Sequence, residues 1–166
     1  MKDPSKDPSR ICIFSLSTGK LELVDRVVLS QEEWQRRLSA GQYRVARMKG
    51  TEPAFSGEYH DLHDVGLYRC ICCGTDLFAS YSKFDSGTGW PSFSAPVHMN
   101  NVGFHEDRSF GMVRTEVTCA RCDAHLGHVF DDGPPPAKTR YCINSASLSF
   151  VPAHGKNREK GDMDGR

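Results

Sequence analysis

The sequence predicts a mainly β fold in which antiparallel sheets form a small β-barrel or sandwich, with a short N-terminal helix and a four-cysteine zinc site. Three observations predict this class. From Gly66 onward, short runs of aromatic and β-branched residues alternate with glycines, prolines and Asn/Asp turns. Helix signals occur in one segment near the N-terminus. Four of the seven cysteines form two Cys-x-x-Cys pairs.

The N-terminal part, residues 1–29, is expected to be an extension ahead of the main domain. Residues 1–10 are polar and contain Asp-Pro-Ser twice, which is typical of a disordered start. The apolar runs at 11–14 and 21–29 predict a peripheral strand or two.

A single helix is predicted after this extension. Ser30 and Glu33 have the spacing of a capping box, and apolar residues follow at helical spacing. Gly41 stands where a helix C-cap belongs. These signals predict a helix over residues 31–40.

The rest of the chain is expected to be a body of short strands. The candidate strands are Leu67–Arg69, Lys83–Phe84, Met112–Thr118, Val129–Phe130 and Tyr141–Val151. Residues 153–166 mix charge with glycine and are expected to be a disordered tail. A chain of 166 residues is most simply one domain with its own core, and we place that domain at residues 30–152.

The paired cysteines, Cys70 with Cys73 and Cys119 with Cys122, predict a metal site. A Cys-x-x-Cys turn presents two thiolates to one ion without strain, and two such turns complete the tetrahedral shell of zinc. The residue after each pair, a glycine or an aspartate, tolerates positive φ, which lets backbone N–H groups turn toward the sulfurs. Two disulfides or scattered free thiols are the alternatives, but nothing else in the sequence indicates an oxidising compartment. We therefore expect one structural zinc per chain.

Charge and hydropathy exclude several classes of function. Lysine plus arginine equals aspartate plus glutamate, at 21 each, so the chain lacks the basic excess of proteins that bind nucleic acid or anionic membranes. No apolar run is long enough for a signal peptide or a membrane span. We therefore expect a soluble, cytoplasmic monomer that binds neither nucleic acid nor membrane.

A cysteine outside the pairs, Cys142, is the candidate nucleophile. In an extended strand Cys142 and Asn144 project from the same face, so a thiol and an amide are presented together. Four thiolates already complete a zinc shell, so His125 and His128 are not needed as ligands and are available as acids. The alternative is a buried structural thiol beside histidines whose hydrogen bonds are satisfied in the core.

Several segments carry a family resemblance. They are Gly87–Phe93 (Gly-Thr-Gly-Trp-Pro-Ser-Phe), His125–Phe130 (His-Leu-Gly-His-Val-Phe), Asp132–Pro134 (Asp-Gly-Pro) and Arg140–Ser145 (Arg-Tyr-Cys-Ile-Asn-Ser). In this order, with the paired cysteines interleaved, they closely resemble the methionine sulfoxide reductase B family. Gly50–Pro53 and Phe55 extend the match upstream, so the resemblance covers roughly residues 30–152.

The resemblance implies an enzyme that reduces the R epimer of methionine sulfoxide, chiefly in proteins, to methionine. It makes Cys142 the nucleophile, which ends the step as a sulfenic acid. It places the Trp90 indole against the methyl group of the substrate. It assigns His125, His128 and Asn144 to binding or protonating the sulfoxide oxygen.

Arg140, two residues before the candidate nucleophile, is expected to contribute to the substrate site and to lower the pKa of the thiol by its charge. Thr51, His105 and Glu106 are weaker candidates. His105 and Glu106 could support the acid, but a solvated charged turn is an equally good interpretation.

The chain departs from many relatives at Thr88, where they carry a cysteine that attacks the sulfenic acid. Cys12, Cys72 or an external thiol must then complete the cycle. Cys12 is preferred because N-terminal segments are often mobile, whereas neighbours bound to zinc hold Cys72. The expected partners are oxidised proteins and thioredoxin or another thiol reductant. The alternative function is a non-catalytic, zinc-containing β module that binds a ligand.

Overall fold

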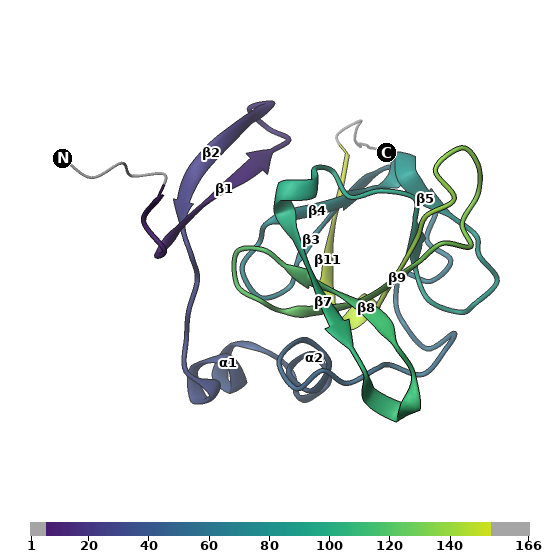
Figure 1. Ribbon diagram of the computed structural model, residues 1–166, viewed down its shortest axis with the longest axis horizontal. Helices are drawn as coiled ribbons and strands as arrows, with labels where there is room; N and C mark the ends of the chain where they lie inside the picture. Colours follow the sequence, from purple (N-terminus) through teal and green to yellow (C-terminus); the bar gives the residue numbers. More distant parts are fainter. Residues whose placement is uncertain (1–5, 154–166) are drawn as a thin grey trace, which may run out of the picture.

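The computed structural model describes residues 6–153 and confirms a mainly β, antiparallel fold. The expected tail lies, apart from Ala153, outside the described residues, as do residues 1–5. Two sheets form the body of the molecule, and every strand pair in them is antiparallel. In Figure 1 their strands run around a ring whose interior is filled by the core.

The larger sheet has six strands. In spatial order they are β5 (Lys83–Phe84), β6 (Ser92–Phe93), β10 (Arg140–Ile143), β9 (His125–Phe130), β8 (Arg114–Cys119) and β7 (Val102–Asp107). The smaller sheet has three strands, β11 (Leu148–Pro152), β3 (Gly66–Cys70) and β4 (Asp76–Ala79). Consecutive strands often pair as hairpins, which suits the frequent turn residues of the sequence.

Aromatic side chains from both sheets form the centre of the core. Phe78 of β4 stacks on Phe93 of β6, with ring centroids 4.4 Å apart. Tyr68 of β3 meets Phe93 edge to face at 5.1 Å. Both are favoured arrangements of aromatic pairs, and they join the two sheets. Tyr141 and Ile143 of β10 also point into this core.

Three strands were absent from the sequence prediction: β4, β6 and β7. Every residue of β4 is buried, so no polar and apolar alternation marks it, and β6 has only two residues. The expected single strand over Tyr141–Val151 is wrong, because a 3₁₀ turn, η5 (Ser145–Ser147), divides it into β10 and β11.

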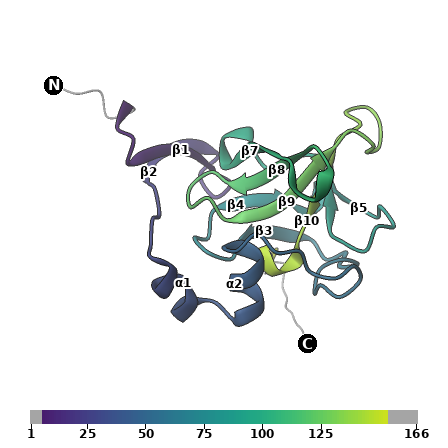
Figure 2. The same cartoon turned by 60° about the horizontal axis from the view of Figure 1, so that its bottom comes forward.

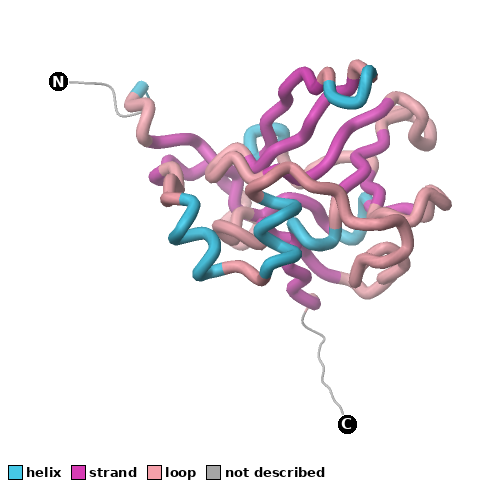
Figure 3. Tube along the Cα trace, turned by 90° about the horizontal axis from the view of Figure 1, so that it is seen from below, coloured by secondary structure: helices cyan, strands magenta, loops and turns pink. Residues whose placement is uncertain are grey.

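The predicted helix over residues 31–40 is two helices, α1 (Gln31–Arg37) and α2 (Ala40–Ala46). Ser30 caps α1 by accepting from the backbone N–H of Glu33, as expected. Ser39 then starts α2 with a full capping box. Gly41 is therefore inside α2 and is not a C-cap. Figures 2 and 3 show both helices on the same side of the barrel.

Both helices pack on the body, and Ala46 of α2 is buried in the core cluster. Trp34 is buried in the core cluster, and the guanidinium of Arg47 lies 4.4 Å from the centre of its ring. None of the helices within residues 6–153 has the length and apolar character that crossing a membrane requires.

The N-terminal extension forms a separate hairpin of β1 (Arg10–Ser15) and β2 (Lys20–Asp25), which confirms the expected peripheral strands. The buried side chain of Asn101 fixes this hairpin to the body. Its Oδ1 accepts from the Phe14 N–H at 2.8 Å, and its Nδ2 donates to the Phe14 carbonyl at 2.9 Å. Asp76 of β4 also accepts from the backbone N–H of Leu16.

Candidate active site and metal centre

Two hairpin turns bring the paired cysteines together. Cys70 ends β3 and Cys73 lies in the turn to β4, while Cys119 ends β8 and Cys122 lies in the turn to β9. The turns have the same backbone pattern: each first cysteine accepts a hydrogen bond from the residue that follows its pair. Those residues have positive φ, 80° at Gly74 and 64° at Asp123, as the sequence predicts.

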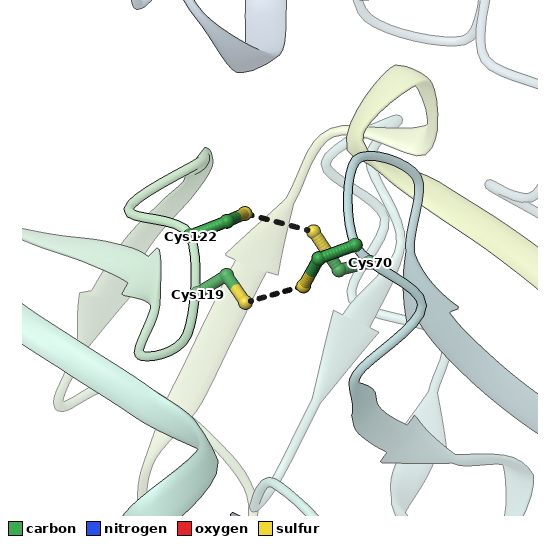
Figure 4. Close-up of side chains that lie close together, drawn as sticks. Cys70, Cys119 and Cys122 are labelled. Atoms are coloured by element: carbon green, nitrogen blue, oxygen red, sulfur yellow. Dashed lines mark hydrogen bonds between the residues drawn. The ribbon is translucent and has the colours of Figure 1, made fainter. Parts of the chain in front are cut away.

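The four sulfur atoms lie within 4.8 Å of one another. Sγ of Cys70 is 3.6 Å from that of Cys122, and Sγ of Cys73 is 3.5 Å from that of Cys119 (Figure 4). Four thiolates at the usual zinc–sulfur distance are about 3.8 Å apart, so this cluster has the size and donor type of a tetrahedral metal site. Arg47 donates to the Cys122 carbonyl at 3.0 Å and adds positive charge beside the sulfurs.

Cys142 lies in the middle of the larger sheet. In the strand register it faces Ser92 of β6 on one side and His128 of β9 on the other. Its neighbours on β10 are buried in the core, whereas Cys142 is partly exposed, so the predicted alternation is confirmed. Gly127 is needed beside it, because a Cβ at that position would collide with the Cys142 carbonyl oxygen.

A cavity of about 180 Å³ opens over the Cys142 thiol. It is lined by Thr51, Thr88, Trp90, Arg114, Gly127, His128, Phe130, Arg140, Cys142, Ile143 and Asn144. Pockets for drug-sized ligands start at about 300 Å³, so this cavity suits a single side chain. The structure thus gathers most of the predicted site residues around one small, partly aromatic space.

Trp90 and Asn144 are both held by the segment before Pro53. The indole N–H of Trp90 donates to the Glu52 carbonyl at 2.9 Å. The Asn144 side chain accepts from the Glu52 N–H at 3.0 Å and donates to the Leu126 carbonyl at 3.0 Å. One N–H of the Asn144 amide remains for a ligand.

Glu52, to which no sequence pattern gave a role of its own, organises this corner. Its buried carboxylate accepts the backbone N–H groups of Ser145 and Ala146, each at 2.9 Å. It thereby holds the turn that follows β10 and carries Asn144. The available signal was its place in the Gly50–Pro53 motif, but the motif alone does not reveal which backbone groups the carboxylate reaches.

The two predicted acids lie side by side, with ring centroids 5.5 Å apart, but only His128 lines the Cys142 cavity. His125 lines a neighbouring cavity of about 420 Å³, which also contacts His128. Nδ1 of His125 is 2.7 Å from a Glu116 carboxylate oxygen. Burial lowers the pKa of His125, and its Nε2 is covered without a hydrogen-bond partner among the described residues.

Arg140 lines the cavity but is engaged elsewhere. Its guanidinium pairs with Asp132 at 2.8 and 3.2 Å and lies 4.5 Å from the centre of the Phe130 ring. Burial raises the pKa of the Cys142 thiol, and the charge of Arg140 and a hydrogen bond from Thr88 act in the opposite direction. The expected effect of Arg140 on the thiol is thus present, but burial outweighs it.

The weaker candidates divide into two groups. Thr51 lines the Cys142 cavity. His105 and Glu106 do not: His105 is exposed on β7, and Glu106 pairs with Arg108. Asp107, the next residue on β7, was not among the candidates, but its carboxylate contacts His128, one of the two predicted acids.

The candidate thiols for recycling lie outside the cavity. Thr88, which is not a thiol, lines the cavity. Cys12 is on β1 of the fixed hairpin, which Figures 1 and 2 show across the barrel from β5 and β9. The structure places Cys12 in a paired strand that is hydrogen-bonded to the body, and this disfavours the movement that a resolving role would need. Cys72 lies within the first metal turn.

Comparisons with known proteins show which family the chain resembles. The model of the SelR domain family matches residues 38–152. A curated peptide methionine sulfoxide reductase MsrB of Acinetobacter baylyi is 54% identical over 146 residues, which are 88% of this chain and 97% of the relative. Proteins of the same name from Hahella chejuensis and Acinetobacter baumannii are each 52% identical, and they cover 84% and 88% of this chain and 100% and 97% of their own lengths.

Proposed function

Because the chain belongs to the methionine sulfoxide reductase B family, an enzyme family, we propose that it reduces methionine (R)-sulfoxide in proteins to methionine through a sulfenic acid on Cys142. The observation that carries this proposal is the partly exposed Cys142 thiol at the base of a cavity of side-chain size. Trp90 supplies an aromatic wall of that cavity, and His128 supplies a group that can hold a proton.

The chemistry needs a nucleophile and an acid. The Cys142 sulfur, as the thiolate, attacks the sulfoxide sulfur while His128 gives a proton to the oxygen. Oxygen passes from the substrate to the enzyme, so the sulfoxide is reduced to a thioether and the thiol is oxidised to a sulfenic acid. The free N–H of Asn144 is a further donor for the oxygen. His125 does not line the Cys142 cavity, so in this proposal it acts only through its contact with His128.

The test of this proposal is selectivity between the two sulfoxide epimers. Exchange of methyl and oxygen would turn the oxygen toward the Trp90 indole and leave His128 without its acceptor. That mismatch costs about 2–3 kcal/mol, so the S epimer should react about 30- to 160-fold more slowly than the R epimer. The measurement is the single-turnover rate of methionine formation from each separated epimer. Similar rates would contradict the proposed orientation of the substrate in the cavity.

For the metal centre we propose one structural zinc held by Cys70, Cys73, Cys119 and Cys122. When bound, the ion supplies cross-linking between the β3–β4 and β8–β9 hairpins, and its full thiolate shell leaves no position for substrate. We also propose a soluble, cytoplasmic monomer with its catalytic domain at residues 30–152; the balanced charge of the chain supports a partner other than nucleic acid.

The recycling step uses thioredoxin or another external thiol in this proposal, with Cys12 as the competing internal route. A bond between Cys12 and Cys142 would require the β1–β2 hairpin to leave its anchors on Asn101 and Asp76. Replacing Cys12 with serine should therefore leave thioredoxin-driven turnover unchanged. Mass spectrometry after one equivalent of substrate, without reductant, should find a sulfenic acid on Cys142. A Cys12–Cys142 disulfide at that stage would instead establish Cys12 as the resolving thiol.

A further inference from the structure

The tip of the β7–β8 hairpin reaches the active site through one carboxylate. Asp107, the last residue of β7, places Oδ2 2.7 Å from Nε2 of His128 on β9. Strand β8 lies between these two strands in the sheet, so the contact spans it. The Asp107 and His128 side chains are 21% and 11% exposed, so water only partly screens the contact.

Other groups hold Asp107 in this position. Its Oδ1 accepts the backbone N–H of Ser109 at 2.9 Å, and Arg114 lies 3.4 Å from its Oδ2. The hydrogen bonds from Ser109 and His128 keep the pKa of Asp107 well below its ordinary value. The carboxylate is therefore ionised at neutral pH and acts as an acceptor.

The two site histidines are held through opposite nitrogens. Glu116 takes Nδ1 of His125, whereas Asp107 takes Nε2 of His128. A carboxylate accepts a proton and cannot donate one, so Nε2 of His128 must carry hydrogen whether the ring is neutral or charged. By elimination, Nδ1 of His128 is the nitrogen left for a ligand in the Cys142 cavity.

We infer that Asp107 is a positioning residue for the reductase step: it accepts the Nε2–H of His128 in the neutral and the charged ring alike, so that in the charged ring Nδ1–H is the proton donor to the sulfoxide oxygen. This inference rests on the proposed function. The charged ring gives its Nδ1 proton to the oxygen and becomes the neutral Nε2–H form. Asp107 remains ionised and bonded to Nε2 throughout, so no other proton moves.

Asp107→Asn tests this role with little change of shape. The amide oxygen can still accept from Ser109, but the amide nitrogen can only donate to Nε2 of His128. The ring should then change to the neutral Nδ1–H tautomer, which is a far weaker acid than the charged ring. Sulfenic acid formation in a single turnover should slow by about 100-fold, a common contribution of general acid catalysis. Glu106→Gln is the matched control, because Glu106 pairs with Arg108 and not with a histidine.

The direct readout is the tautomer of His128, from ¹⁵N NMR of the histidine-labelled full chain, with a His128→Gln variant to assign the signals. In the neutral ring we expect the hydrogen on Nε2 in the wild type and in Glu106→Gln, and on Nδ1 in Asp107→Asn. An Nδ1–H tautomer in the wild type overturns the inference without any Asp107 variant. An unchanged tautomer or an unchanged single-turnover rate in a folded Asp107→Asn protein also overturns it. A wild type that reduces neither epimer would refute the proposed function, while the tautomers would still decide the contact.

Discussion

Replacing Cys142 with serine is expected to lower the rate of methionine formation from the R sulfoxide by more than about a thousandfold. A serine hydroxyl cannot supply the polarisable thiolate that attacks the sulfoxide sulfur. The fold should survive this change. Cys142 is partly exposed on the cavity face of β10, and its buried neighbours Tyr141 and Ile143 make the core contacts of the strand. Circular dichroism and metal content should match those of the wild type.

The matched control is Cys12→Ser, which makes the same atomic change on β1, outside the lining of the Cys142 cavity. It should retain the single-turnover rate on the R sulfoxide. Substantial turnover by a folded Cys142→Ser protein would exclude Cys142 as the nucleophile.

Replacing Cys119 with serine should have the largest effect on stability. Cys119 is completely buried at the end of β8, and its sulfur lies 3.5 Å from that of Cys73, so the two cysteine turns meet at this residue. Serine is a poor zinc ligand at neutral pH, and binding to a site that exists only in the folded chain contributes directly to folding free energy. We expect loss of bound zinc together with more than about 4 kcal/mol of the free energy of unfolding.

Metal content per chain and denaturant unfolding in the same buffer measure these two losses. Cys72→Ser is the control, because Cys72 lies in the same turn but outside the four-sulfur cluster, so its replacement should leave the metal in place. A metal-free Cys119→Ser protein with the stability and activity of the wild type would show that the cluster is not a structural metal site.

The features that sequence analysis predicted correctly depend on short stretches of chain. A Cys-x-x-Cys turn is a local structure, so the pairs and their positive-φ followers at Gly74 and Asp123 were visible without a fold. The alternation that exposes Cys142 is likewise a property of four consecutive residues. The Ser30 cap was recognisable for the same reason.

The errors came where a second local signal or a distant partner decides the outcome. The capping box at Ser39 overrode the expected continuation of the first helix to Gly41. The buried carboxylate of Glu52 accepts the backbone N–H groups of Ser145 and Ala146, and the chain turns there instead of continuing as one strand. The strand that carries Cys12 is attached to the body through Asn101, which is far from it in sequence, so no local pattern revealed this attachment.

By itself, the sequence determined the family, and it predicted the four clustered cysteines and the candidate nucleophile, because each is carried by short motifs of the chain. Only the tertiary structure decided which groups hold the two histidines. Asp107 meets His128, and Glu116 meets His125, through the register of β7, β8 and β9, and no local pattern encodes that register. Pairing between strands brings together side chains that are distant in sequence, so the partner of each acid appears only once the sheet is formed.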